Sequence, residues 1–379
     1  MEGSILIVGI HTRPAVFSAK RAGLEVYSVD YFGSMDTQSV ADISRSIIEQ
    51  KPYKSMGRMS VDYSGEKLVE LSKDLNADYV ILASTVDLKK KNILGNRPEV
   101  MRRIKDKEYQ LRKVEKLGFR IPETEVITSR EEAIEVAKNF GFPVVIKPVK
   151  GAGGRGITLV KAPSEIPEIV GKMLIQRYVK GKKFSVSTIS TRDHSKMLST
   201  SIQILGSKLL NQKNFVYCGN IIPFLNLDKK MLKEIEGMAV DISRAFDVIG
   251  WNGIDLTVSE EPVFMELNPR FQGTFDCVER AYGINLIDAH IKACEGELIE
   301  VPHPKNHSVR MTLFAKKRSI VTQSLEGLSL DVPCKYAIIE EGEPITTVVE
   351  SSANRKHAIM NAVGKIKAIY RNSIAKYPT

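Results

Sequence analysis

A pair of acidic residues in the second half of the chain could bind a metal ion. Residues 253–258 and 263–268 alternate between apolar and polar side chains, and the four residues 259–262 between them predict a β-hairpin. In the register that this loop sets, Asp255 lies opposite Glu266. Two carboxylates that face each other on a sheet repel unless a cation neutralises them. Mg²⁺, which prefers oxygen ligands, would do so.

The same register predicts what surrounds the two carboxylates. Asn268 lies on their face, and Arg270 follows it two residues later. The other face is apolar, and its predicted pairs are Ile254 with Leu267, Leu256 with Met265, and Val258 with Val263. The alternative is a solvated polar face on an ordinary hairpin. Other parts of the chain must distinguish the two interpretations.

A glycine-rich segment is a second candidate for chemistry. Residues 151–156 (GAGGRG) join a predicted strand at 142–149 to another at 157–160. A Walker-type loop or a Rossmann fingerprint joins a strand to a helix, so this loop has no helix dipole to use. Its glycines can adopt positive φ and donate backbone N–H groups to phosphates. A flexible hairpin tip is the alternative, but Lys147 and Lys150 add positive charge and favour phosphate binding.

The first hundred residues alternate between strands and helices, which is typical of a parallel sheet covered by helices. Strands are expected at 4–9, 24–30 and 79–83, and helices at 14–22 and 65–75. The turn after the first strand lacks the G-x-G-x-x-G of a dinucleotide site, although Asp30 sits where a ribose-binding acid would. We therefore expect this part to supply one wall of a substrate pocket or only to pack, with His11 and Arg13 as candidates to face a substrate carboxylate.

The rest of the chain predicts further short strands and helices. After a break at residues 94–98, a helix is expected that runs through Asp106-Lys107 to about residue 117. Further helices are expected at 130–140, 231–245 and 285–294, and strands at 174–179 and 184–190. From residue 308 several strands precede a closing helix, whose apolar stripe consists of Ile359, Ala362, Val363, Ile366, Ile369 and Tyr370. This stripe indicates packing rather than a binding face.

Composition narrows the class of protein. The 379 residues predict two or three domains, and a net charge of +10 favours anionic partners. Basic residues cluster only at 89–91 and 102–105 and are not interleaved with aromatics, so a nucleotide and an anionic substrate explain the charge better than nucleic acid does. We expect no membrane segment and no signal peptide. The four cysteines form no C-x-x-C pair, so we expect neither zinc nor disulfides, and a cytoplasmic location.

Three separated pieces together resemble one known family. In order and spacing, Asp106-Lys107, Ile146-Lys147-Pro148 and Glu266-Leu267-Asn268-Pro269-Arg270 resemble the ATP-grasp superfamily, above all its ATP-dependent carboligases related to biotin carboxylase and carbamoyl-phosphate synthase. The resemblance covers about residues 1–300. It implies an α/β plus α+β fold with a Rossmann-like N-terminal domain at 1–100, two ATP-clamping lobes at 101–175 and 176–300, and a small C-terminal β-rich segment at 301–379 that ends in a helix.

The resemblance also implies roles for single residues. Lys107 and Lys147 would contact the phosphates of ATP, Lys147 also near its adenine end, and Gly153, Gly154 and Gly156 would cap the phosphates. Gln176, Arg177, Tyr178 and Val179 would form the inter-lobe strand whose backbone reads adenine. Asp255, Glu266 and Asn268 would bind Mg²⁺, with Mn²⁺ as an alternative ion, and Arg270 and Lys147 are the catalytic candidates. Lys183 departs from the family, which often places a ribose-binding glutamate there, and leaves ribose recognition open.

The implied function is that of an ATP-dependent carboxylate–amine or related ligase. A substrate carboxylate would attack the γ-phosphorus to give an acyl phosphate and ADP, and an amine or similar nucleophile would then displace phosphate. Such chemistry needs positioning and charge neutralisation more than a protein nucleophile. The alternatives are a bicarbonate-activating carboxylase and a non-catalytic nucleotide-binding protein, while the missing glycine fingerprint disfavours an NAD-linked dehydrogenase. We expect small-molecule partners, neither nucleic acid nor membrane, and a homodimer as in related enzymes.

Overall fold

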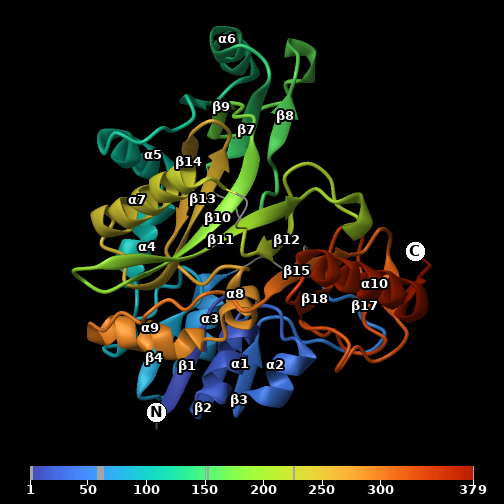
Figure 1. Ribbon diagram of the computed structural model, residues 1–379. Helices are drawn as coiled ribbons and strands as arrows, with labels where there is room; N and C mark the ends of the chain where they lie inside the picture. Colours follow the sequence, from blue (N-terminus) through green and yellow to red (C-terminus); the bar gives the residue numbers. More distant parts are fainter. Residues whose placement is uncertain (1–2, 58–63, 150, 152, 225–226, 379) are drawn as a thin grey trace.

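The computed structural model describes residues 3–57, 64–149, 151, 153–224 and 227–378. Within these residues the strands form four β-sheets (Figure 1). Lys150, one of the two lysines expected to add charge beside the glycine loop, lies outside the described residues.

The N-terminal residues form a parallel sheet in the order β3-β2-β1-β4-β5. Its strands are β1 Ser4–Val8, β2 Glu25–Asp30, β3 Ile43–Ser46, β4 Tyr79–Leu82 and β5 Ile93–Leu94, and the helices beside them are α1 Arg13–Arg21, α2 Met35–Val40 and α3 Gly65–Leu71. The central strand β1 is apolar and almost wholly buried, as expected of a parallel sheet that is covered on both faces. The predicted alternation of strands and helices is confirmed, but the short polar elements α2 and β3 had no periodicity that would predict them.

An antiparallel sheet in the order β6-β9-β7-β8 forms the upper part of the molecule in Figure 1. Its strands are β6 Thr124–Ile127, β7 Val144–Pro148, β8 Thr158–Val160 and β9 Met173–Arg177, with the short 3-10 turn Pro163–Glu165. The helix α6 Arg130–Phe140 packs on β6 and β9, whereas α4 Pro98–Lys105 and α5 Lys107–Lys116 precede the sheet in the chain and contact a strand of the large sheet described below. The β7–β8 pairing confirms that the glycine-rich segment joins strand to strand.

The predicted continuous helix through Asp106 is wrong. Asp106 is extended, with φ −75° and ψ 106°, and separates α4 from α5. Its side chain accepts hydrogen bonds from the backbone N–H groups of Glu108 and Tyr109 at 3.0 and 3.1 Å. Aspartate at this position caps the following helix, so Lys107 becomes the first residue of α5.

The largest sheet is antiparallel and runs in the order β14-β13-β10-β11-β12-β15-β18. Its strands are β10 Lys182–Ser190, β11 Ser195–Leu205, β12 Tyr217–Ile222, β13 Gly250–Val258, β14 Pro262–Asn268, β15 His307–Phe314 and β18 Pro344–Ser352. Three later strands, β16 Ser319–Val321, β17 Ile338–Ile339 and β19 Ile374–Lys376, form a separate small sheet. A 3-10 turn at Lys208–Leu210 precedes β12.

Two long helices pack on the large sheet. α7 Lys229–Ala245 contacts β10 and β11, and α10 Arg355–Ser373 contacts β15 and β18. Ala362, Ile366 and Ile369 of the predicted stripe are buried in this contact, whereas Tyr370 is 37% exposed. In the part of the chain that the structure describes, no helix has the length and apolar character of a membrane span.

The hairpin β13–β14 differs from its predicted register near the loop. Asp255 pairs with Glu266 and Ile254 with Leu267 as predicted, but Leu256 pairs with Phe264 and Val258 with Pro262. The connection therefore has three residues instead of four, and a β-bulge at Met265 makes up the difference. As a consequence Met265 lies at the cavity described below, and Phe264 takes its place in the core.

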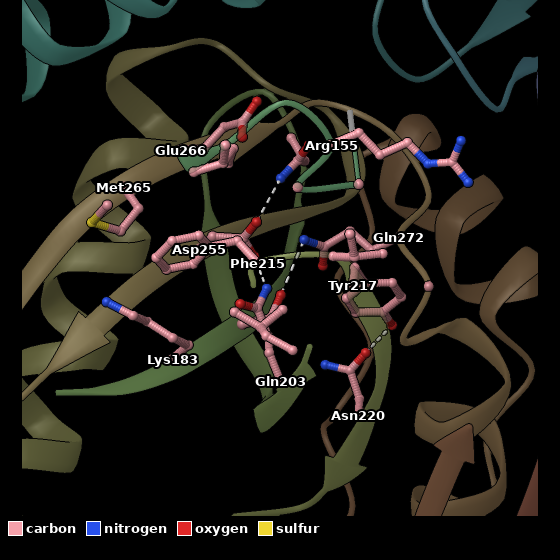
Figure 2. A pocket seen from close by; sticks show the side chains of 18 of the residues that line it. Arg155, Lys183, Gln203, Phe215, Tyr217, Asn220, Asp255, Met265, Glu266 and Gln272 are labelled. Carbon is pink, nitrogen blue, oxygen red and sulfur yellow. Dashed lines mark hydrogen bonds between the residues drawn. The ribbon is translucent and has the colours of Figure 1, made fainter. Parts of the chain in front are cut away.

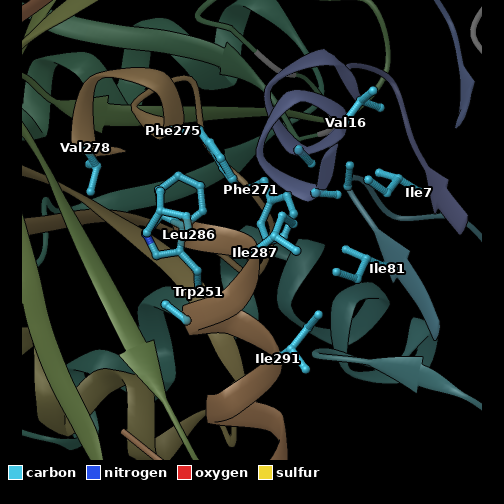
Figure 3. Packing of buried hydrophobic residues seen from close by; sticks show 14 of the residues in the cluster. Ile7, Val16, Ile81, Trp251, Phe271, Phe275, Val278, Leu286, Ile287 and Ile291 are labelled. Atoms are coloured by element: carbon cyan, nitrogen blue, oxygen red, sulfur yellow. The ribbon is translucent and has the colours of Figure 1, made fainter. Parts of the chain in front are cut away.

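One hydrophobic cluster joins the N-terminal sheet to the large sheet. Trp251 of β13 packs against Phe271 and Phe275, with ring centroids 5.6 and 4.9 Å apart. Ile7 and Ile81 of the N-terminal sheet belong to the same cluster (Figure 3), together with residues of α8 Phe275–Tyr282 and α9 Leu286–Glu295. This shared core fixes the loops of the N-terminal sheet beside the large sheet.

Candidate functional site

A cavity of about 500 Å³ lies where the three larger sheets meet. The site residues predicted from the sequence that line it are Lys107, Lys147, Gly153, Gly154, Gln176, Arg177, Tyr178, Val179, Asp255, Glu266, Asn268 and Arg270. Gly156 is the predicted site residue that does not line it, and a Cβ added there would lie 3.4 Å from the ring of Pro148. The fold therefore brings together segments that are far apart in the sequence.

The carboxylate pair is only partly compensated by hydrogen bonds. Gln203 Nε2 donates to one oxygen of Asp255 at 3.0 Å (Figure 2). Asn268 Nδ2 donates to the other oxygen at 3.2 Å. Burial, and then the charge of Glu266, raise the pKa of Asp255 to about 7. Within the described residues, Glu266 takes part in no side-chain hydrogen bond or ion pair. The charge of Arg270 acts in the opposite direction and lowers the pKa of Asp255, but in the described part of the chain Arg270 forms no ion pair with either carboxylate.

The donor set fits a hard divalent cation. In the described part of the chain, no group of three or more His, Cys, Asp and Glu side chains is placed to hold a metal. A site here would thus consist of two carboxylates and the amide of Asn268, which suits Mg²⁺ because that ion usually takes one or two carboxylates and completes its shell with phosphates and water. Arg270 lies beside these groups and donates to Asn268 Oδ1 at 3.3 Å.

Two lysines bring positive charge to the same cavity. Lys147 on β7 is 7% exposed, and burial, followed by repulsion from Lys107, lowers its pKa to about 8. Glu266 acts in the opposite direction and raises this pKa. Lys107 begins α5 and reaches the same cavity. A buried ammonium group that faces a second cation is suited to binding a polyanion such as a triphosphate.

Gly153 and Gly154 of the glycine-rich segment line the cavity. Gly153 and Gly154 have φ of +66° and +74°, values that L-residues with a side chain rarely adopt. Tyr217 donates its backbone N–H to Gly153 O at 3.0 Å, and a Cβ added at Gly154 would lie 1.9 Å from Phe215 O. Glycine is therefore required where this loop meets the segment before β12.

The segment after β9 lines the cavity around Lys183. The Nζ of Lys183 donates to Val179 O and to Thr257 Oγ1, both at 2.9 Å, and lies 5.2 Å from the ring centroid of Tyr178. Burial lowers the pKa of Lys183 to about 8. The lysine that departs from the family pattern is thus held by the predicted adenine-reading strand itself.

A row of polar side chains crosses the large sheet from the carboxylate pair. Asp255 on β13 pairs with Ser185 on β10, and Ser185 pairs with Ser201 on β11. Gln203 lies two residues after Ser201 on the same face of β11 and pairs with Asn220 on β12. Asn220 in turn pairs with Arg310 on β15. Figure 2 shows Glu266 and Lys183 on one side of Asp255, and Tyr217 and Asn220 on the other. Four strand spacings separate β13 from β15, or about 19 Å. The cavity therefore extends well beyond the candidate metal site.

Buried charges close this far end. Arg13 is fully buried and does not line the cavity, so the prediction that it faces a substrate carboxylate is wrong. Its guanidinium donates to both oxygens of Asp276 at 2.7 and 2.6 Å and to Asp331 Oδ1 at 2.7 Å. Arg310 donates to the same two carboxylates at 3.0 and 3.2 Å. His11, the other candidate from the first turn, does line the cavity.

Several lining residues were not predicted from the sequence. They are Gln203, Tyr217, Asn220, Gln272, Arg310 and Asp331. Arg310 could have been found, because Ser308, Arg310 and Thr312 alternate with apolar residues and so share one face of a strand. Asp331 gave no such signal, since it lies in a loop with a φ of +57°.

Comparison with known proteins agrees with this geometry. Residues 104–274 match the family model described as ATP-grasp domain. An uncharacterized protein of Methanocaldococcus jannaschii is 31% identical over 371 residues, which cover 94% of this chain and 90% of that protein. The carbamoyl phosphate synthase large chain of Thermotoga maritima is 24% identical over 322 residues, or 79% of this chain, but this match spans only 27% of that protein.

Solved structures share the whole fold. The biotin carboxylase of Campylobacter jejuni in complex with β-γ-ATP has a TM-score of 0.72 at 18% identity, over 98% of this chain and 92% of that one. The carboxyaminoimidazole ribonucleotide synthase of Aspergillus clavatus complexed with ATP has a TM-score of 0.73 at 15% identity, over 98% and 99% of the two chains. Together with the family match and the full-length relative, these likenesses show that the chain belongs to the ATP-grasp superfamily.

Proposed function

We propose that this protein is an ATP-dependent ligase that activates a substrate carboxylate as an acyl phosphate, which an amine or a similar nucleophile then attacks. One observation carries the proposal: Asp255 and Glu266 line a cavity that also contains Lys107 and Lys147 and that continues across the sheet to Arg310. Such a cavity has room for a nucleotide and for a second molecule beside its phosphates. The ATP complexes of two structural neighbours support the nucleotide.

ATP would lie between residues 101–175 and 176–300, which we propose as the two clamping lobes. The backbone of Gln176–Val179 would contact adenine, and Lys107, Lys147, Gly153 and Gly154 would contact the phosphates. Asp255, Glu266 and Asn268 would hold Mg²⁺, and the bound ion supplies charge neutralisation at the phosphates. Gly156 would act by shaping the loop, because it lies against Pro148.

The remaining groups would orient the reactants. A carboxylate oxygen of the substrate attacks the γ-phosphorus, and the bond to the bridging oxygen of ADP breaks. Arg270 would stabilise negative charge on the transferring phosphoryl group, since its guanidinium lies beside Asn268. This step requires alignment and fixed charges and no covalent bond to the protein.

A bicarbonate-activating carboxylase is the second candidate. The likeness to a biotin carboxylase and to a carboxyaminoimidazole ribonucleotide synthase favours it. The length of the cavity favours a larger carboxylate, because about 19 Å of polar sheet separates β13 from β15. Bicarbonate therefore belongs in the same panel of substrates.

The test measures ADP release with ATP and Mg²⁺ against a panel of carboxylates, with hydroxylamine present to trap any acyl phosphate as a hydroxamate. We expect at least one carboxylate other than bicarbonate to give hydroxamate and ADP in equal amounts. Glu266→Gln should lower both rates by about 100-fold or more. Absence of stimulation by every carboxylate, or equal rates in Glu266→Gln and wild type, would contradict the ligase function.

A further inference from the structure

His11 and Asp331 form a hydrogen-bonded pair at the cavity wall. His11 lies in the turn between β1 and α1, and Asp331 lies in the loop between β16 and β17, 320 residues further along the chain. The distance from His11 Nε2 to Asp331 Oδ1 is 2.6 Å. Both residues line the cavity, and 28% of the His11 side chain is exposed.

The surroundings keep Asp331 ionised and in place. Burial alone would raise the pKa of Asp331, but the charges of Arg13, His11 and Arg310 hold it well below its ordinary range. The backbone N–H groups of Asp331 and Val332 donate to the carboxylate of Asp36 at 2.9 and 3.0 Å, which fixes the loop at its unusual positive φ. The charged groups around the pair are thus Arg13 on α1, Asp36 on α2, Asp276 on α8 and Arg310 on β15.

This arrangement determines which nitrogen of His11 carries a hydrogen. An ionised carboxylate can only accept hydrogen bonds, so Nε2 donates and Nδ1 carries the lone pair whenever the ring is neutral. Among the residues that the structure describes, none makes a hydrogen bond to Nδ1 of His11. The edge-on ring of Phe32, with its centroid 6.3 Å away, packs beside the imidazole.

A purely structural role explains the pair poorly. Asp331 already receives hydrogen bonds from Arg13 at 2.7 Å and from Arg310 at 3.2 Å, so its charge is compensated without His11. The histidine adds a basic nitrogen at the wall of the cavity instead. This is the geometry of a general base that a carboxylate orients.

We propose that His11 is the general base of the second half-reaction and that Asp331 positions it. The inference rests on the proposed ligase function, and it assigns the nucleophile to the class of amines that are protonated at neutral pH. His11 Nδ1 takes one proton from the ammonium group, and the resulting imidazolium is stabilised by Asp331. The free amine attacks the acyl carbon, the carbon–oxygen bond to phosphate breaks, and the second proton leaves with hydrogen phosphate. His11 then releases its proton to water.

Hydroxylamine and an alkylamine separate this role from that of the ATP site. Hydroxylamine is largely unprotonated at neutral pH, so it needs no base to become a nucleophile. With the carboxylate found in the panel, wild type, His11→Gln and Asp331→Asn are compared in hydroxamate formation and in amide formation from glycine and a series of primary amines. His357→Gln, which replaces an exposed histidine on α10, is the matched control. Thermal melts of each variant test whether it is folded.

We expect both variants to form hydroxamate within about threefold of the wild-type rate and to lose amide formation by about 100-fold. His357→Gln should change neither rate. Equal losses of hydroxamate and amide, or no loss of amide, would overturn the role of His11 while leaving the ligase function intact. If wild type forms hydroxamate but no amine in the series forms an amide, the assignment of an amine is wrong. If wild type forms no hydroxamate with any carboxylate, the proposed function itself fails, and His11 loses its role with it.

Discussion

Asp255 and Glu266 lie directly opposite each other on β13 and β14, and the β-bulge at Met265 begins one residue toward the hairpin loop. The bulge lets a three-residue loop coexist with this pairing, because it inserts one extra residue on β14. Without the bulge, the register set by the pair Val258 and Pro262 would continue along both strands. Asp255 would then pair with Met265 instead of Glu266. The bulge is therefore what aligns the two carboxylates.

Removing one of the two like charges should stabilise the free protein. In buffer without Mg²⁺ and nucleotide, Glu266→Gln should raise the melting temperature by about 1–2 °C, because facing like charges cost up to about 1 kcal/mol. Differential scanning calorimetry measures this, and the gain in melting temperature that Mg²⁺ and ATP give to wild type should disappear in the variant. Glu261→Gln in the same hairpin is the control, since Glu261 forms an exposed ion pair with Arg120. A lower melting temperature for Glu266→Gln in free buffer would contradict the repulsion.

Replacing the buried arginine of α1, Arg13, should lower the free energy of unfolding far more than replacing an arginine of an exposed ion pair. Arg13→Met leaves Asp276 and Asp331 buried with only part of their hydrogen bonds, and we expect it to lower the free energy of unfolding by about 3–5 kcal/mol. Arg45→Met, which breaks an exposed pair with Asp74, should cost less than about 1 kcal/mol. Urea denaturation followed by tryptophan fluorescence measures both, because Trp251 lies in the core that joins the two sheets. Similar losses in the two variants would rule out the buried network as a source of stability.

A methyl group at Gly154 should open the glycine loop. It would collide with Phe215 O, so Gly154→Ala should displace the loop and weaken ATP binding by about tenfold or more. Gly141→Ala is the control, because Gly141 also has a positive φ, of +77°, but a Cβ there would meet no atom within 4 Å. That variant should lose about 1 kcal/mol of stability and keep its affinity for ATP. Isothermal titration calorimetry with ATP and Mg²⁺ measures the affinity of both variants for ATP. An unchanged affinity in Gly154→Ala would show that the position of this loop does not contribute to binding.

His290 should make the fold sensitive to acid. Its Nδ1 accepts from the backbone N–H of Trp251 at 2.9 Å, and burial lowers its pKa from 6.5 to about 4. The unfolded chain therefore binds a proton between pH 6.5 and 4 that the folded protein does not, so stability falls as the pH drops through this window. The full effect is on the order of 3 kcal/mol.

The substitution His290→Asn isolates this contribution, because asparagine can accept the same hydrogen bond and does not titrate. We expect the difference in urea midpoint between pH 7.5 and pH 5 to be smaller in His290→Asn than in wild type. His357→Asn, at an exposed position, should behave as wild type does. An identical pH dependence of the urea midpoint in His290→Asn and wild type would mean that groups other than His290 cause the loss of stability at low pH.

Much of the fold could be predicted because its signals are local. The apolar strands β1 and β4 and the helix α6, which begins and ends as predicted at Arg130 and Phe140, follow from periodicity and from glycine and serine at the helix ends. The break at Asp106 is also local, because an aspartate at this position caps the helix that follows it, although the helical pattern on both sides of it predicts one continuous helix. The predicted pairing of Asp255 with Glu266 was right although the predicted loop was one residue too long, since the bulge compensated for the difference.

The far end of the cavity could not be predicted because it depends on distant contacts. Arg13 binds Asp276 and Asp331, which are 263 and 318 residues away, and no spacing in the sequence connects them. The helix α8 that carries Asp276 was missed, and the loop of Asp331 has no periodicity. The family resemblance indicates the nucleotide end through matching motifs, whereas the signal for His11 is only its position after a strand of a parallel sheet.

The transfer of oxygen from substrate to phosphate tests the central claim most directly. The carboxylate that stimulates ADP release is labelled with ¹⁸O in both oxygens, and the inorganic phosphate formed with ATP, Mg²⁺ and the nucleophile is analysed by mass spectrometry. If the carboxylate attacks the γ-phosphorus, each phosphate released contains one ¹⁸O atom from the substrate. Phosphate that contains no ¹⁸O would show that water or another group receives the phosphoryl group, and would contradict activation as an acyl phosphate.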